Sequence, residues 1–437
     1  MTARLDRYFS RLESRQPWRW QGRVVESVAQ TIESEGPPAS VGECCEVQDL
    51  AGRLHAAEVI GFRGAHVLTM PLESTGGVRF GDPVWSQGQR AQIEVGPALM
   101  GRVLDALGAP IDAGPRPPIA ATLSLEGKVL PPLDRVAIGE PLGTGIRAID
   151  ALLTVGRGQR VGIFGGSGVG KSTLIGMMTR NTDAELIVVG LVGERGREVG
   201  EFLRDSLGAE GLARAVVVVS TSDQSPLLRM RAAMGAATIA EHFAAQGKHV
   251  LLVLDSLTRF AMAAREIGLA AGEPPTAKGY TPSVFTRLAR LVERAGRFRS
   301  GSITAFYTVL MEGDDQQDPL VDAVRSLLDG HIVLSRARAS EGWYPPIEIL
   351  DSISRLMPAV ATASHREQAA LVRKLLAVYA RSEDLVRIGA YKPGADAELD
   401  RALRARDAIR AFLAQDAAER VRFADCIERL ARLAAEV

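Results

Sequence analysis

The sequence predicts an α/β protein in which a central domain, built on a mostly parallel sheet, lies between a small β-barrel and a helical domain. Three patterns support this fold class. Residues 21–95 contain short strand-like runs, residues 145–360 alternate apolar strands with helical patterns, and the chain from about 365 to 437 is helical in pattern. Because 437 residues are too many for one ordinary core, two or three domains are expected.

Residues 1–20 predict a short amphipathic N-terminal helix. Leu5, Tyr8, Phe9 and Leu12 fall on one helical face, and arginines occupy the rest of the surface. Such a helix either docks on its own protein or acts as an arm for a partner or a membrane surface. The pattern fits both roles.

Residues 21–95 predict an antiparallel β-barrel, because runs such as HAAEVIGF and AHVLTM are separated by Gly and Pro. This segment holds 5 Arg, no Lys and 10 Asp or Glu, a net charge of −5. A barrel that binds nucleic acid needs the opposite sign, so we expect no nucleic-acid partner. The Gly/Pro-rich connector at 101–118 then indicates a domain boundary.

Residues 96–360 predict the α/β domain and residues 361–437 the helical C-terminal domain. In the first range, apolar strands alternate with helical patterns, which is typical of a mostly parallel sheet with helices on both faces. The predicted strands are RVGIF, ELIVVGLV, RAVVVVS, HVLLVLD, SITAFYTVL and GHIVLSR.

The composition indicates a cytoplasmic protein that is at most peripherally attached to a membrane. With 52 basic and 52 acidic residues, the chain has no global attraction to nucleic acid or anionic lipid. Its three cysteines, Cys44, Cys45 and Cys426, have neither disulfide-framework nor metal-ligand spacing, which fits a reducing compartment. Neither a signal region nor an apolar run long enough to span a membrane is visible in the sequence.

The strongest motif is RVGIFGGSGVGKSTL at 160–174, where a Gly-rich loop joins an apolar strand to a helix. It matches the phosphate-loop pattern G-x-x-x-x-G-K-[ST]. Backbone amides can surround a polyphosphate only where no Cβ intrudes, and the helix N-terminus adds positive potential. Lys171 would reach the β- and γ-phosphates of ATP, and the Ser172 hydroxyl would ligate Mg²⁺. The predicted phosphate-binding residues are Gly165, Gly166, Ser167, Gly168, Val169, Gly170, Lys171, Ser172 and Thr173.

Two carboxylates end buried strands of the predicted sheet. Asp255 closes HVLLVLD and Glu194 follows ELIVVGLVG, so both lie at the strand ends where α/β sheets bind ligands. Asp255 would hold Mg²⁺ through water, or alternatively cap the next helix. Glu194 would orient the water that attacks the γ-phosphate, with Arg195 steadying the phosphate or the glutamate. The residues alone leave this role level with a solvated loop.

The order of five strings resembles the type III secretion ATPases, and most closely the flagellum-specific export ATPases, which are related to the rotary ATP synthase catalytic subunit. The strings are GIFGGSGVGKSTL, GLVGERGREVGEF, LLVLDSLTRFA, GEPPTAKGYTPSVF and LLDGHIVLSR. The resemblance covers about residues 20–437. It implies a RecA-like ATPase core between the barrel and the helical domain, and a homohexamer with ATP sites between protomers.

The resemblance also assigns roles to single residues. Glu194 corresponds to the carboxylate that polarises water, and Arg195 and Arg259 to residues close to the γ-phosphate. In ILDSISRLMP, Arg355 corresponds to an arginine finger supplied in trans; an intrachain ion pair is the alternative. The base-binding residues follow from the same comparison. Tyr344 corresponds to the residue that packs on adenine, and Tyr391 is expected to line the same site.

Several partners are implied as well. The first helix resembles the arm that binds a dimeric stator protein. Residues 379–389, YARSEDLVRIG, fall where the family's C-domain faces the central-stalk protein and the membrane export gate. Export substrates and their chaperones complete the set, and the implied location is the cytoplasm, peripherally on the inner membrane.

The function implied is an ATP-hydrolysing motor of type III protein export, most closely the flagellar one, which docks, unfolds and exports substrate proteins. An injectisome ATPase, a rotary synthase catalytic subunit and an RNA translocase of the termination-helicase type are the alternatives among enzymes. A ring subunit that binds nucleotide without turnover is the non-enzymatic alternative, and the intact Lys171, Glu194 and Asp255 argue against it.

Overall fold

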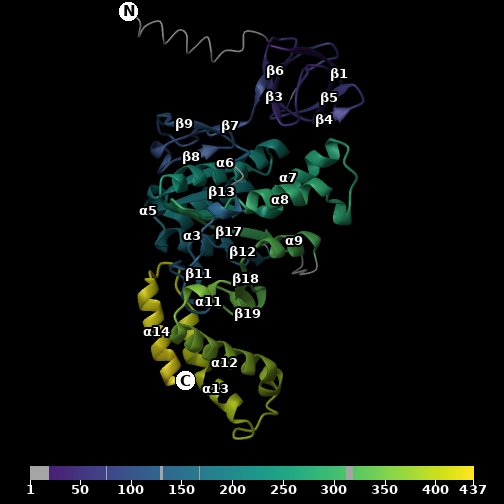
Figure 1. Ribbon diagram of the computed structural model, residues 1–437. Helices are drawn as coiled ribbons and strands as arrows, with labels where there is room; N and C mark the ends of the chain where they lie inside the picture. Colours follow the sequence, from purple (N-terminus) through teal and green to yellow (C-terminus); the bar gives the residue numbers. More distant parts are fainter. Residues whose placement is uncertain (1–18, 75, 128–130, 167, 312–317) are drawn as a thin grey trace, which may run out of the picture.

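The protein is elongated, with the barrel at one end, the main sheet in the middle and three long C-terminal helices at the other end (Figure 1). The computed structural model describes residues 19–74, 76–127, 131–166, 168–311 and 318–437. The helix predicted over residues 1–20 therefore lies almost wholly outside the described residues.

Six antiparallel strands form the closed N-terminal barrel, in the order β1-β2-β5-β4-β3-β6. They are β1 (Gln21–Val28), β2 (Thr31–Glu35), β3 (Glu43–Gln48), β4 (Leu54–Arg63), β5 (His66–Pro71) and β6 (Pro83–Arg90). Alternate side chains, among them Val24, Val47 and Val84, fill the interior. After the barrel, β7 (Gln92–Val95) pairs with β9 (Ala121–Ser124) in a separate small sheet, so the barrel closes at Arg90 rather than at 95.

The central domain is built on a nine-stranded sheet in the order β19-β18-β12-β17-β15-β13-β14-β8, with β16 paired to β17. Its strands are β8 (Val103–Asp105), β12 (Arg160–Gly165), β13 (Leu186–Glu194), β14 (Ala215–Thr221), β15 (His249–Asp255), β16 (Gly296–Arg297), β17 (Ser302–Leu310), β18 (Gly330–Leu334) and β19 (Ile347–Ser354). All six predicted apolar runs form parallel strands of this sheet, which confirms the α/β prediction. Only β16 and β19 run antiparallel to their neighbours.

Helices cover both faces of this sheet, and the side chains of β13 show why. Val188 and Val192 pack into the core on the side of α6 and α7, whereas Ile187 and Val189 pack on the side of α2 and α3. A strand buried on both faces requires the continuous apolar run seen in the sequence. The helices of this domain are α2 (Arg147–Leu152), α3 (Lys171–Asn181), α4 (Gly196–Glu201), α5 (Gly208–Ala213), α6 (Pro226–Ala245), α7 (Leu257–Ala270), α8 (Pro282–Val292), α9 (Pro319–Leu327), α10 (Arg336–Ser340) and α11 (Met357–Val360).

The C-terminal helices share a core with one face of the sheet. They are α12 (Ala363–Arg387), α13 (Ala397–Leu413) and α14 (Phe423–Glu436). Leu375, Ile409 and Leu430 from these helices belong to the same buried cluster as Ile149 of α2 and Ile175 of α3. Within the described ranges, no helix combines the length and the apolar character needed to cross a bilayer.

Candidate active site

The phosphate loop joins β12 to α3 and leaves its inner face open. Gly168 and Gly170 have φ angles of +78° and +93°, a region that residues with a Cβ rarely adopt. A Cβ built on Gly168 would meet no heavy atom within 4 Å, so the loop borders open space there. Among the described residues no side chain caps α3 at Gly170, which leaves the first amides of the helix available to an anion. Val169 is buried and anchors the loop, whereas Ser172 and Thr173 are exposed.

The start of the loop is tightly packed. A Cβ on Gly165 would lie 3.0 Å from the Cβ of Leu334 at the end of β18. Gly166 is buried beside it, and Ser167 lies outside the described residues. The strand end therefore has no room for a larger residue at 165.

Lys171 supplies a buried positive charge with no hydrogen-bond partner. The residue is 8% exposed, and its Nζ donates to no atom of the described residues. Burial lowers the pKa of Lys171, while the charges of Asp255 and Glu194 act in the opposite direction. An unpaired buried ammonium is costly, so the residues present fit a polyphosphate whose oxygens would accept from Lys171.

Asp255 ends β15 at the same edge of the sheet and is held by a threonine. The Thr308 Oγ1 of β17 donates to Asp255 Oδ1 at 2.5 Å, and Asp255 is 7% exposed. The alternative role of capping α7 belongs to Ser256, whose hydroxyl accepts from the Arg259 amide. Asp255 therefore does not cap α7.

The donors at this edge fit Mg²⁺ held beside a nucleotide. Among the described residues, no three His, Cys, Asp or Glu side chains form a cluster that could hold a metal ion alone. Magnesium in nucleotide sites keeps several waters and takes one or two protein oxygens together with phosphate oxygens. Asp255 and the exposed Ser172 supply such oxygens.

Glu194, the last residue of β13, has strongly shifted proton affinity. Burial raises its pKa to about 8, and the charge of Asp255 and a hydrogen bond shared with Glu198 act in the same direction. The positive charge of Arg259 opposes them. A carboxylate with a pKa near working pH is suited to accept a proton, and the partial burial of Glu194 sets it apart from a solvated loop residue.

The two arginines near Glu194 differ in placement. The stem of Arg259 lies over Gly193, where a Cβ would be 2.9 Å from the Arg259 Cβ and where φ is +72°. The Arg259 Nε is buried without a partner among the described atoms. Arg195 instead points outward: its side chain is 79% exposed and pairs with Glu198 at 3.6 Å.

Tyr344 lies beside the phosphate loop and Tyr391 does not. A Cβ on Gly170 would lie 3.8 Å from the Tyr344 ring, which is half exposed. Tyr391 lies between α12 and α13, where its hydroxyl donates to the Asp400 carboxylate at 2.8 Å. The Tyr344 carbonyl accepts a hydrogen bond from the backbone N–H of Gln415 at 2.8 Å.

Arg355 lies at the opposite edge of the sheet from its own phosphate loop. It follows β19, which runs antiparallel to β18, so that Ser354 pairs with Gly330 at the start of β18. Along β12, from Arg160 to Gly165, the two edges are roughly 17 Å apart at about 3.3 Å per residue. The Arg355 side chain is exposed, and the intrachain ion pair considered as its alternative role is not found in the described part of the chain.

Two contacts of this site have no clear signal in the sequence. Thr308 was visible only as a polar residue inside the apolar run SITAFYTVL, where a buried hydroxyl must find a partner. Glu198 has no predicted role in the sequence, but its side chain shares a hydrogen bond with Glu194. No pattern in the sequence distinguishes Glu198 from the other charged residues near it.

The fold and this site define a phosphate-loop ATPase. Residues 145–354 match the family model of the ATP synthase alpha/beta nucleotide-binding domain, and residues 361–432 match the T3SS EscN ATPase C-terminal domain. The chain belongs to the ATP synthase alpha/beta family, in its type III secretion branch, and its activity is ATP hydrolysis.

Similar proteins cover nearly the whole chain. The flagellum-specific ATP synthase of Treponema pallidum (strain Nichols) is 52% identical over 98% of this chain and 96% of that protein. The type 3 secretion system ATPase of Xanthomonas euvesicatoria is 48% identical over 90% of this chain and 89% of that protein. The assembled ATPase EscN of enteropathogenic E. coli, solved in complex with its central stalk EscO, superposes with a TM-score of 0.87 at 44% identity, covering 94% of this chain and 100% of that one.

Proposed function

We propose that this protein is the ATP-driven motor of a flagellar type III export apparatus, working as a homohexameric ring with ATP and Mg²⁺ bound between protomers. One observation carries the catalytic part: the buried, unpaired Lys171 lies at the same sheet edge as the carboxylates of Asp255 and Glu194. The flagellar assignment rests on the identity to a flagellum-specific relative, and an injectisome ATPase is the second candidate because its relative is nearly as similar.

Each residue of the site has a task in this proposal. The phosphate loop and Lys171 bind the β- and γ-phosphates, and Ser172 and Asp255 hold Mg²⁺, which neutralises phosphate charge when bound. Glu194 orients the attacking water and accepts its proton, and Arg259 stabilises the ionised form of Glu194 through its positive charge.

The remaining roles belong to the ring. Arg355 of one protomer serves the neighbour's γ-phosphate, since its own phosphate loop is at the far edge of the sheet. Arg195, exposed beside Glu198, steadies the γ-phosphate or Glu194 once a nucleotide is bound. Tyr344 packs on the adenine, and Tyr391, held by Asp400, contributes at most from outside the base site.

The partners extend the proposal to the two ends of the molecule. At the end of α12, Leu385 and Ile388 are exposed, which suits docking of a central-stalk protein and the export gate, as EscN binds its stalk EscO. Residues 1–20 would bind the dimeric stator protein. The ring would handle export substrates and chaperones in the cytoplasm, peripherally attached to the inner membrane, without nucleic acid.

Replacing Glu194 by Gln tests the catalytic assignment. The variant keeps the shape of the side chain but cannot accept a proton, so ATP affinity should remain near normal while turnover falls by at least ~10²-fold. The matched control is Glu201→Gln, because Glu201 pairs only with the exposed Arg197 of the same helix. Turnover of Glu194→Gln close to that of the wild type would refute the assignment.

Rings that mix two variants test whether Arg355 acts on the neighbouring protomer's site. Arg355→Ala should abolish turnover in a pure ring while each protomer still binds ATP. Combined with Lys171→Ala protomers, activity should partly return, because each variant supplies the part that the other lacks. Absence of any recovery would argue against a finger acting in trans.

A further inference from the structure

We propose that Gln159 is a positioning residue for Arg355: together with the backbone carbonyl of Asp329 it fixes the segment from which the arginine projects. This inference rests on the proposed trans role of Arg355. Gln159 precedes β12, far in sequence from the end of β19, and the two meet at the edge of the sheet opposite the phosphate loop.

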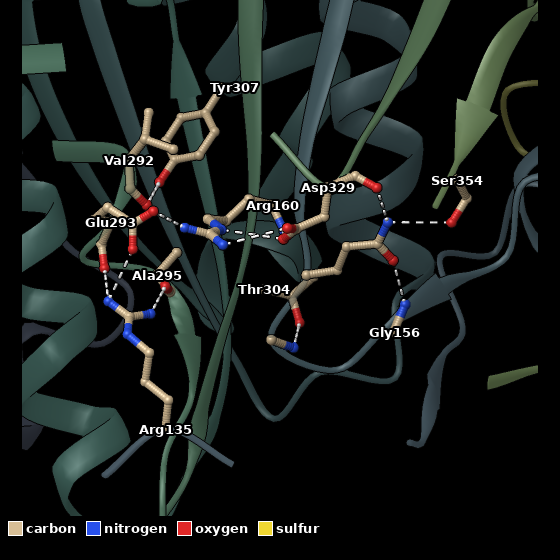
Figure 2. A network of polar contacts seen from close by, with 12 residues as sticks. Arg135, Gly156, Arg160, Val292, Glu293, Ala295, Thr304, Tyr307, Asp329 and Ser354 are labelled. Carbon is tan, nitrogen blue, oxygen red and sulfur yellow. Dashed lines mark hydrogen bonds and ion pairs between the residues drawn. The ribbon is translucent and has the colours of Figure 1, made fainter. Parts of the chain in front are cut away.

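Every polar atom of the Gln159 side chain is used. The residue is 0% exposed, and its Oε1 accepts from the Gly156 amide at 2.8 Å. Its Nε2 donates to the Asp329 carbonyl at 3.2 Å and to the Ser354 hydroxyl at 3.1 Å. Figure 2 shows Asp329 and Ser354 approaching the same amide nitrogen from two sides. A buried amide satisfied in this way has one orientation only.

The same contacts hold the chain on both sides of the peptide bond between Ser354 and Arg355. The Arg355 amide donates to the Asp329 carbonyl at 3.0 Å, the oxygen that Gln159 also contacts. The Ser354 hydroxyl in turn donates to the Thr154 carbonyl at 2.7 Å. Residues 354 and 355 are therefore fixed although they lie just where a strand ends, a place where chains usually fray.

Asp329 is itself held from the side away from the finger. Its carboxylate accepts from the Arg160 amide at 3.0 Å and from Arg160 Nε at 3.1 Å. Arg160 also pairs with Glu293, which Arg135 contacts in turn (Figure 2). Arg160 thus ties Asp329, whose carbonyl accepts from the Arg355 amide, to the first residue of β12, and Arg135 lies at the far end of this network.

The packing around this point leaves little freedom. A Cβ on Gly330, the residue after Asp329, would lie 2.6 Å from the Ile353 carbonyl and 3.2 Å from Gln159 Nε2. Because β18 and β19 approach so closely here, a change in the Gln159 side chain would shift the position of the Arg355 backbone. A finger must meet a phosphate on another protomer, where a misplacement of about 1 Å can cost ~10²-fold in rate.

The test compares Gln159→Met, Arg355→Ala and the control Arg135→Ala in full-length rings. Met keeps the length and bulk of Gln but donates no hydrogen bond. Gln159→Met should lower kcat by ~10–10²-fold, with the affinity of the isolated protomer for a fluorescent ATP analogue unchanged. Arg135→Ala loses contacts of the same network that do not reach β19, and its kcat should equal that of the wild type.

Mixed rings separate positioning from a general structural defect. Gln159→Met protomers should regain activity with Lys171→Ala protomers, which supply a properly held finger. They should regain none with Arg355→Ala protomers, because both lack the same part. Ser354→Ala, a smaller change, should give a weaker loss with the same complementation pattern and serves if Gln159→Met does not fold.

The outcomes distinguish the two proposals. If Arg355→Ala keeps its turnover, the trans finger itself is refuted, whatever Gln159 does. If Arg355→Ala is inactive while Gln159→Met and Ser354→Ala turn over like the wild type, only the positioning role is overturned. It is equally overturned if the Gln159→Met loss is not relieved by Lys171→Ala protomers.

Discussion

Replacing Thr308 by Val removes one hydroxyl beside the proposed magnesium site and leaves the shape of the side chain nearly unchanged. The hydroxyl donates to Asp255 Oδ1 at 2.5 Å in a fully buried position. A hydrogen bond to a charged acceptor contributes about 1.5–3 kcal/mol, and residues that orient a metal ligand typically change metal affinity by about 10–100-fold when mutated. We therefore expect the Mg²⁺ concentration at half-maximal turnover to rise at least ~10-fold.

The assay is steady-state ATP hydrolysis at saturating ATP, titrated with Mg²⁺. Thr308→Ser should restore the midpoint because it restores the donor. The control is Thr69→Val, since Thr69 is another buried strand threonine whose hydroxyl donates to a backbone carbonyl, but in the barrel. A Thr308→Val midpoint equal to that of the wild type would refute the reasoning, as would an equal shift in Thr69→Val.

Two further predictions concern the residues around Glu194, the proposed catalytic carboxylate. In the proposed mechanism the ionised form of Glu194 is the active one, so kcat/KM should rise with pH through about 8. Glu198→Gln removes a neighbour that raises this pKa and should move the inflection to lower pH, whereas Glu201→Gln should not. An inflection that stays in place would contradict the assignment. Gly193→Ala forces an alanine to φ +72° against the side chain of Arg259. This should lower the free energy of unfolding by roughly 1–2 kcal/mol and lower turnover. Gly196→Ala, with open space around its Cβ, should change neither quantity. Equal behaviour of the two variants in thermal unfolding and ATPase assays would refute the steric argument.

The parts of the fold that the sequence could predict are those in which the residues of one segment, by their own pattern, show how that segment is buried. A strand covered by helices on both faces must be apolar throughout, and β13 and β15 have that pattern. The phosphate loop is equally local, because Gly168 and Gly170 need left-handed backbone whatever surrounds them.

The rest of the site depends on neighbours that are distant in sequence. Thr308 meets Asp255 across 53 positions, and Gln159 meets Asp329 across 170. The register of adjacent strands creates both contacts, and strands that are apolar on both faces have no alternating pattern that would set this register. A strand inside the Gly/Pro-rich connector is a similar case. The connector at 101–118 contains β8, which pairs with β14 and extends the main sheet.

The direction of β19 has a consequence for how neighbouring sites communicate. The strand lies between Tyr344, next to a protomer's own phosphate loop, and Arg355 at the far edge. In the proposed ring, β19 would therefore link two active sites, and its pairing with β18 shifts register between His331 and Val333, partway along this link. A base entering one site would then act on the strand that ends at the arginine of the next site, without any contact between the two nucleotides.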